Sequence, residues 1–166
     1  MPERIEKHEM YVDALTGLRD LKGLYKDYQD KDLSGIHFMY VDIDDFNRMN
    51  VVFGVDTVDD MLKYVAETLV DYCGKSTVYR VGNDQFVLLT SSHIICEPIE
   101  LQRILQTPFK HHQIQYVINA SICIADYDDF KGDTLKQMLN LLHITIDKTK
   151  NQGRNTLIYV DQSHKQ

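Results

Sequence analysis

The alternation of apolar and polar positions divides this chain into helix-like and strand-like segments. Residues 36–43 form a nearly continuous apolar run, which is typical of a strand buried on both faces of a sheet. Between 57 and 71, apolar side chains recur about every 3.6 residues, which predicts a helix. Two short β-patterned runs between 77 and 90 flank Gly82-Asn83, and such a pair predicts a hairpin with a two-residue turn.

The same patterns place the remaining elements and predict a fold class. We expect further helices at 21–29, 97–106 and 134–150, one helical turn at 46–50, and strands at 113–125 and 155–160. The resulting order β-α-β-β-α-β-α-β predicts an α/β fold, in which helices flank a mixed five-stranded sheet with a ferredoxin-like βαββαβ core. Residues 1–12 are expected to be a helical lead-in from an upstream region of a longer protein, and residues 13–166 to be the domain itself.

Composition and charge narrow the classes of function. The net charge of -7 argues against binding to a nucleic acid polymer, which requires clustered lysine and arginine. It leaves a nucleotide open as a ligand, since a metal ion can supply the positive charge. No apolar run approaches the roughly 18 residues of a membrane span, and no signal peptide is present, so we expect a cytoplasmic segment without membrane contact.

The cysteines are predicted to be reduced. Cys73, Cys96 and Cys123 lack the spacing of a metal site, and an odd number without a secretion signal indicates free thiols. We expect Cys73 to be exposed and Cys123 to lie in the core.

Two carboxylates lie at positions where they could hold a metal ion. Asp42 closes the buried strand and Asp84 lies at the tip of the hairpin, so both are predicted to reach one edge of the sheet. Carboxylates suit magnesium, although most hairpin tips are plain turns without chemistry. Asp44 and Asp45 are expected merely to cap the helical turn that follows them.

Six segments resemble, in order, the motifs of the GGDEF domain of bacterial diguanylate cyclases. They are residues 13–18, 41–46 followed by Asn50, Gly54 with Asp59, 80–86, 120–125 and 150–155. The fourth corresponds to R-x-G-G-D-E-F, the signature of that family. Because the segments cover nearly the whole chain, it is identified as a member of this family.

The resemblance implies a reaction and a set of site residues. Members join two GTP molecules into cyclic di-GMP, with one GTP on each subunit of a facing dimer. By resemblance, magnesium is held by Asp42, the Ile43 carbonyl and Asp84, with Asp84 also at the catalytic position. The implied nucleotide-binding residues are Asn50 and Asp59 for guanine, Lys150 and Arg154 for phosphates, and Gly82 and Asn83 of the signature loop.

The sequence departs from the family where the reaction takes place. Asn83 replaces the second glycine of the signature, and its side chain narrows the approach to substrate. Gln85 replaces the glutamate, and an amide carries no charge and cannot act as a base. Asn47 replaces a lysine, and the Arg and Asp of the inhibitory product site are missing from residues 73–76. Such losses typically cost about 10² to 10⁴ in rate.

We therefore predict a degenerate GGDEF domain of cyclic di-GMP signalling, whose cyclase activity is lost or nearly lost. It would act as a binding module for GTP or another guanine nucleotide, or as a regulatory or dimerisation domain under an upstream sensor. The alternative is a low-activity diguanylate cyclase that converts two GTP to cyclic di-GMP and pyrophosphate.

Overall fold

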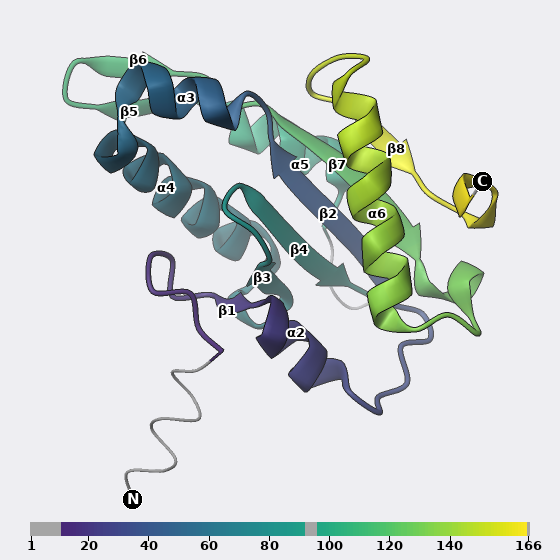
Figure 1. Cartoon of the computed structure of the whole chain (residues 1–166). Coiled ribbons are helices and arrows are strands. Elements are labelled where there is room, and N and C mark those ends of the chain that lie inside the picture. The colour runs from purple at the N-terminus through teal and green to yellow at the C-terminus, as the bar shows by residue number, and fades with distance from the viewer. Residues whose placement is uncertain (1–10, 92–95, 166) are drawn as a thin grey trace, which may run out of the picture.

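The computed structural model describes residues 11–91 and 96–165, which form a mixed six-stranded sheet covered by helices on both faces (Figure 1). The sheet order is β1-β3-β4-β2-β7-β8. Its strands are β1 (Arg19–Asp20), β2 (His37–Ile43), β3 (Val78–Arg80), β4 (Gln85–Thr90), β7 (Ala120–Asp126) and β8 (Leu157–Tyr159). The α/β fold with a mixed sheet between helices is thereby confirmed.

The central strand β2 explains why residues 36–43 are so apolar. It pairs antiparallel with β4 on one side and with β7 on the other, so every residue from Phe38 to Ile43 is buried. Successive side chains point to opposite faces. Met39 and Val41 therefore enter one hydrophobic core, and Phe38 enters the other.

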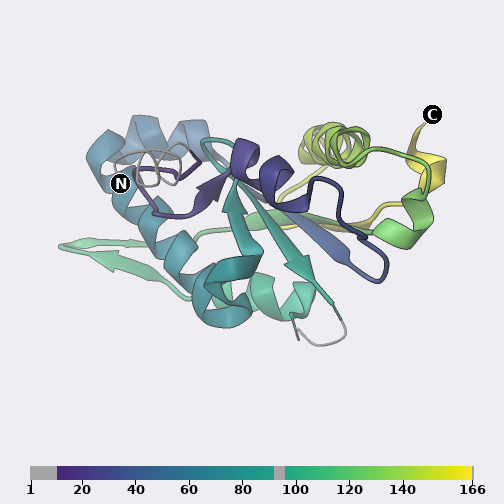
Figure 2. The same cartoon turned by 90° about the horizontal axis from the view of Figure 1, so that it is seen from below.

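The helices are divided between the two faces of the sheet (Figure 2). Their bounds are α2 (Leu21–Tyr28), α3 (Phe46–Phe53), α4 (Val55–Cys73), α5 (Pro98–Leu105) and α6 (Leu135–Lys150). The first core contains residues of α3, α4 and α5, and the second contains residues of α2 and α6. Short 3₁₀ turns lie at η1 (Lys75–Thr77), η2 (Tyr127–Phe130) and η3 (Gln162–Lys165).

The sheet differs from the prediction at two places. Its sixth strand, β1, contributes only two residues, which pair in parallel with β3. The predicted strand at 113–125 is divided, because its first part turns back as β6 (Ile114–Tyr116) on β5 (Phe109–His111) in a separate hairpin. The carbonyl of Asn119 then accepts a bond of 2.9 Å from the Asp44 amide, outside the strand ladder, before β7 begins. An alternating pattern does not reveal such a break, since both parts keep the same alternation.

The turn between β3 and β4 is longer than predicted. The strands end at Arg80 and resume at Gln85, and Gly82 is not among the residues with positive φ, so the two-residue turn is wrong. The amides of Val81 and Gly82 both donate to the Gln85 carbonyl, at 2.9 and 3.3 Å. The Arg80 guanidinium holds the loop in place, donating to the carbonyls of Gly82 and Asn83 at 3.2 and 2.7 Å.

The prediction that all three cysteines are reduced is wrong for two of them. Cys73, at the end of α4, forms a disulfide with Cys96, just before α5, with Cα atoms 5.8 Å apart. Cys73 is buried rather than exposed, because the packing of α5 on α4 brings residues separated by 23 positions together. Cys123 is buried in β7 as predicted, and burial followed by the negative charge of Asp42 raises the pKa of its thiol to about 12.

Most of the predicted lead-in, residues 1–10, lies outside the described residues. Among the helices within 11–91 and 96–165, none combines the length and the apolar composition needed to cross a bilayer.

Candidate nucleotide and metal site

The structure brings Asp42 and Asp84 together at one end of β2. Asp42 is the penultimate residue of β2 and is only 2% exposed. Asp84 ends the loop before β4, and its carbonyl accepts the Ile43 amide at 3.0 Å, which extends the strand pairing into the loop. Burial, and next the negative charge of Asp42, raise the pKa of Asp84 to about 6, although Lys150 opposes the rise.

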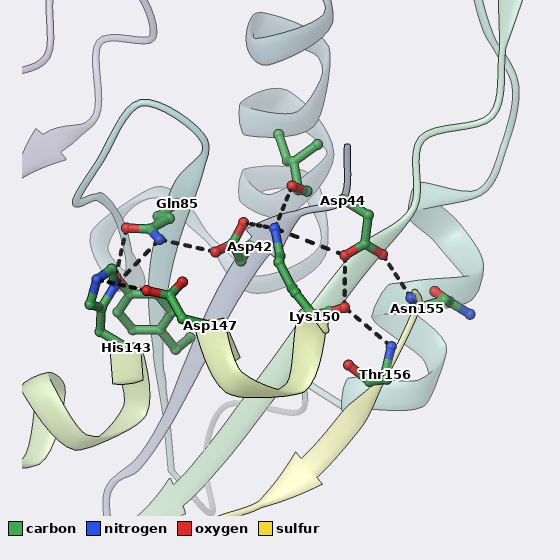
Figure 3. A network of polar contacts seen from close by, with 11 residues as sticks. Asp42, Asp44, Gln85, His143, Asp147, Lys150, Asn155 and Thr156 are labelled. Carbon is green, nitrogen blue, oxygen red and sulfur yellow. Dashed lines mark hydrogen bonds and ion pairs between the residues drawn. The ribbon is translucent and has the colours of Figure 1, made fainter. Parts of the chain in front are cut away.

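Lys150, the last residue of α6, reaches the end of β2 and contacts Asp42 (Figure 3). Its ammonium donates to Asp42 Oδ1 and to the Ile43 carbonyl, the latter at 2.8 Å. Asp44 Oδ1 is 4.0 Å away. The cation therefore lies between two of the three predicted metal ligands.

Gln85 donates a hydrogen bond to the other side of Asp42. Its Nε2 lies 3.0 Å from Asp42 Oδ2, and its Oε1 accepts the Tyr40 hydroxyl at 2.8 Å. His143 Nδ1 lies 3.0 Å from the Tyr40 oxygen, and His143 Nε2 lies 3.3 Å from Asp147 Oδ2 (Figure 3). The network thus runs from the buried carboxylate to the surface of α6, and the amide of Gln85 is fixed within it.

Neither neighbouring aspartate caps α3 with its side chain, so that prediction is wrong. Asp44 is buried and accepts Ser121 Oγ at 2.8 Å and the Asn155 amide at 2.7 Å, which joins β2 to β7 and to the segment before β8. Asp45 stands at the N-cap position, but its backbone is left-handed, with φ of 59°, and its side chain makes no capping bond. Its carboxylate instead pairs with Arg154 Nε at 2.8 Å.

An ion pair between Arg80 and Asp13, which was not predicted from the sequence, anchors the signature loop. Arg80 donates to both oxygens of Asp13, at 3.1 and 2.9 Å, besides its bonds to the loop carbonyls. Asp13 also accepts the Thr16 amide and hydroxyl. Burial would raise the pKa of Asp13, but the hydrogen bonds from Thr16 and Arg80 outweigh it and hold the pKa below its usual value. The presence of Asp13 and Arg80 in two separate motifs was the available signal.

We expect Arg80→Ala to lower the free energy of unfolding by about 2 kcal/mol, because it removes the ion pair to the partly buried Asp13 and the donor to two loop carbonyls. Urea unfolding followed by circular dichroism measures the change. Arg103→Ala is the matched control, because Arg103 pairs with Glu100 on the exposed side of α5, and we expect no measurable change there. Equal losses in the two variants would contradict the anchoring role.

The remaining predicted residues lie outside this network. Asn50 is on α3 and Asp59 on the adjoining α4, both partly exposed, and within residues 11–91 and 96–165 neither side chain makes a hydrogen bond. Asn83 is exposed. A Cβ at Gly82 would lie 2.8 Å from Gln85 Oε1, so a larger residue there would displace the end of the Gln85 side chain. Arg154 is 60% exposed and bonded to Asp45, beside a cavity of about 270 Å³ that Arg48 and Tyr116 also line.

The chemistry of the three oxygen donors suits magnesium, which prefers carboxylate and carbonyl oxygens. Asp42, the Ile43 carbonyl and Asp84 would hold it, and the ion would then neutralise the charge of a triphosphate. Two of these oxygens, however, already accept bonds from Lys150. In the described part of the chain, no three or more His, Cys, Asp or Glu side chains are grouped so that they could hold a metal, and this includes Asp42, Asp44 and Asp84.

The fold is that of nucleotide-cyclase-like α/β domains, and comparison with known proteins identifies the family. Residues 10–156 match the family described as "Diguanylate cyclase, GGDEF domain". The chain therefore belongs to the GGDEF family of cyclic di-GMP signalling, as its motifs predicted.

Individual relatives are distant and longer. A membrane protein of uncharacterised function from Staphylococcus saprophyticus is 23% identical over 169 residues, covering 92% of this chain and 47% of that protein. The cyclic di-GMP phosphodiesterase NbdA of Pseudomonas aeruginosa is 27% identical over 162 residues, covering 93% of this chain and 19% of that protein. The chain thus spans about half the length, or less, of these relatives.

Solved structures support the same fold. The coiled coil and GGDEF domain of DgcB from Caulobacter crescentus, in complex with cyclic di-GMP, gives a TM-score of 0.79 at 18% identity, covering 96% of this chain and 91% of that chain. At this identity the likeness bears on the fold alone.

Proposed function

We propose that this chain is a degenerate GGDEF domain that binds a guanine nucleotide and acts as a regulatory or dimerisation module, with cyclase activity lost. The observation that carries the proposal is the place of Gln85, whose neutral amide is bonded to Asp42 in a closed network. The family's glutamate would put a charge at that point. Here the amide can neither take a proton from an attacking hydroxyl nor attract a metal.

The chemistry of cyclic di-GMP synthesis indicates what this substitution removes. A 3′-hydroxyl must lose its proton and attack an α-phosphate, while the triphosphate charge is neutralised. Magnesium, when bound, would supply that neutralising charge. Asp84 is the remaining acidic side chain of the signature, and its raised pKa of about 6 leaves it mostly ionised at neutral pH. It is still able to help hold a cation, but the second carboxylate of the motif is gone.

Retained residues support nucleotide binding. Asn50 and Asp59 keep side chains that match the donors and acceptor of the guanine edge, and neither is engaged elsewhere in the described part of the chain. They project from two helices that pack on each other. The relatives are longer than this chain, which is compatible with a further region in the protein; a sensor upstream of residues 1–12 is part of the proposal.

Titration calorimetry with GTP, followed by mass spectrometry of the same mixture, tests the proposal. We expect heat of binding with GTP and none with ATP, and cyclic di-GMP at least about 10²-fold below that from an active GGDEF domain assayed in parallel. Asp59→Ala should weaken GTP binding by about tenfold or more, since a hydrogen bond from guanine to a charged group is lost. Asp56→Ala, on the exposed first turn of α4, is the control.

Two outcomes would change the assignment. The absence of heat at millimolar GTP would exclude the nucleotide-binding module and leave a purely structural dimerisation domain. Steady production of cyclic di-GMP would establish the alternative, a low-activity diguanylate cyclase that also releases pyrophosphate.

A further inference from the structure

We propose that Lys150 is a built-in counter-ion of Asp42, and that it competes with divalent metals for the same oxygens. This inference deepens the proposed function and rests on it for the expectation that a divalent ion belongs at this site. It adds that the chain itself supplies a cation at the metal position, so that metal affinity is set by a residue of α6.

The burial of Asp42 creates the need for a counter-ion. The residue is 2% exposed, and an ionised carboxylate at such a position must be paired. Lys150 supplies the charge, and Gln85 supplies a hydrogen bond of 3.0 Å to the second oxygen. Both oxygens of Asp42 therefore have donors.

The ammonium of Lys150 contacts oxygens that a bound metal would also need. Lys150 also donates to the Ile43 carbonyl, at 2.8 Å, so its nitrogen contacts both a carboxylate and a carbonyl oxygen of the same strand end. A divalent ion held by Asp42 and the Ile43 carbonyl would need the same two oxygens. The ion would have to displace Lys150, or bind against the repulsion of its charge.

The carboxylates around Lys150 still attract a divalent ion, so the ion can compete with the ammonium. Asp44 lies 4.0 Å from the ammonium, and Asp84 is close enough to Asp42 for the two charges to interact, so the site holds more carboxylates than Lys150 alone can neutralise. Arg154 pairs with Asp45 instead. A divalent ion is thus attracted, and Lys150 sets how strongly it binds.

Binding of Mn²⁺ alone, followed by the electron paramagnetic resonance signal of the free ion, tests the proposal. The neutral variant Lys150→Met should bind Mn²⁺ about tenfold or more tighter than the wild type, because no ammonium has to leave a buried carboxylate. Lys148→Met is the matched control on the same helix, since Lys148 is exposed and lies outside the network. It should bind as the wild type does. In Asp42→Asn/Lys150→Met the gain should disappear.

Thermal unfolding provides a second measurement, in case Lys150→Met is poorly folded without metal. Mn²⁺ should then raise the melting temperature of Lys150→Met far more than that of the wild type. The proposal is overturned if Lys150→Met binds Mn²⁺ no tighter than the wild type. It is also overturned if Mn²⁺ neither stabilises nor folds this variant. No nucleotide is present in either measurement, so this result is independent of whether the domain binds GTP.

Discussion

Replacing Asp44 with alanine is expected to lower the free energy of unfolding by about 3 kcal/mol, because the buried Ser121 hydroxyl and the partly buried Asn155 amide lose their acceptor. Asp44 is 4% exposed and accepts hydrogen bonds from Ser121 Oγ and from the Asn155 amide. Its removal leaves the fully buried Ser121 hydroxyl without this acceptor. It also takes a negative charge from beside Lys150, which stands 4.0 Å away.

Urea unfolding at neutral pH measures this loss. Asp45→Ala is the control, because it removes the same side chain one residue later, where the partner is the largely exposed Arg154. We expect Asp45→Ala to cost only about 1 kcal/mol, mainly because alanine tolerates the left-handed backbone of this position less well than aspartate, since most surface ion pairs contribute little. A loss for Asp44→Ala as small as that for Asp45→Ala would show that β2, β7 and the segment before β8 are held together without this carboxylate.

Gln85→Glu is expected to destabilise the fold by about 2 kcal/mol at pH 8, although it restores the family's residue. The new carboxylate would stand where an amide now donates to Asp42 at 3.0 Å, so two negative charges would face each other away from water. Asp84 already shows the effect, since burial and Asp42 raise its pKa to about 6.

The sign of the pH dependence follows from that repulsion. Burial and the like charge of Asp42 raise the pKa of the introduced carboxyl group in the folded state above its unfolded value of about 4.3. The folded protein therefore holds the proton more tightly, and stability relative to wild type falls as pH rises from about 5 to 8. Urea unfolding at both pH values checks this.

Gln137→Glu is the matched control for Gln85→Glu. Gln137 accepts the Thr134 amide in the capping box of α6, and glutamate fills that role equally well, so little change is expected. If Gln85→Glu matched the wild type at pH 8, then the side chain at position 85 would not face Asp42, and the proposed role of Gln85 in this network would be wrong.

The sequence predicted the elements whose pattern is local. The helical stripe that became α4 and the apolar run that became β2 follow from the burial of those segments, and both are confirmed. The pairing of β1 with β3 was not predictable, because two residues carry no period. The disulfide between Cys73 and Cys96 depends on how α5 packs on α4, which residue spacing does not reveal.

The sequence predicted which residues form the candidate site, but not which of them contact one another. The motifs named Asp42, Asp84 and Lys150, and the structure brings these three together. Their roles as metal and phosphate ligands stay predictions. Lys150 bonds to Asp42, and Asp44 accepts the Asn155 amide. Both contacts depend on where the end of α6 lies relative to β2. A helix-capping role was the simpler local expectation for Asp44, and a tertiary contact replaced it.

The sequence separation of these contacts has a consequence for synthesis of the chain. Asp42 and Lys150 are 108 residues apart, and Asp44 and Asn155 are 111 apart. At a translation rate of about 5–20 residues per second, β2 leaves the ribosome roughly 5–20 s before its partners are made. During that time its aspartates lack these partners, so the nascent chain cannot complete the sheet around them. The contacts that close this end of the sheet around Asp42 and Asp44 therefore form only after residue 155 has emerged.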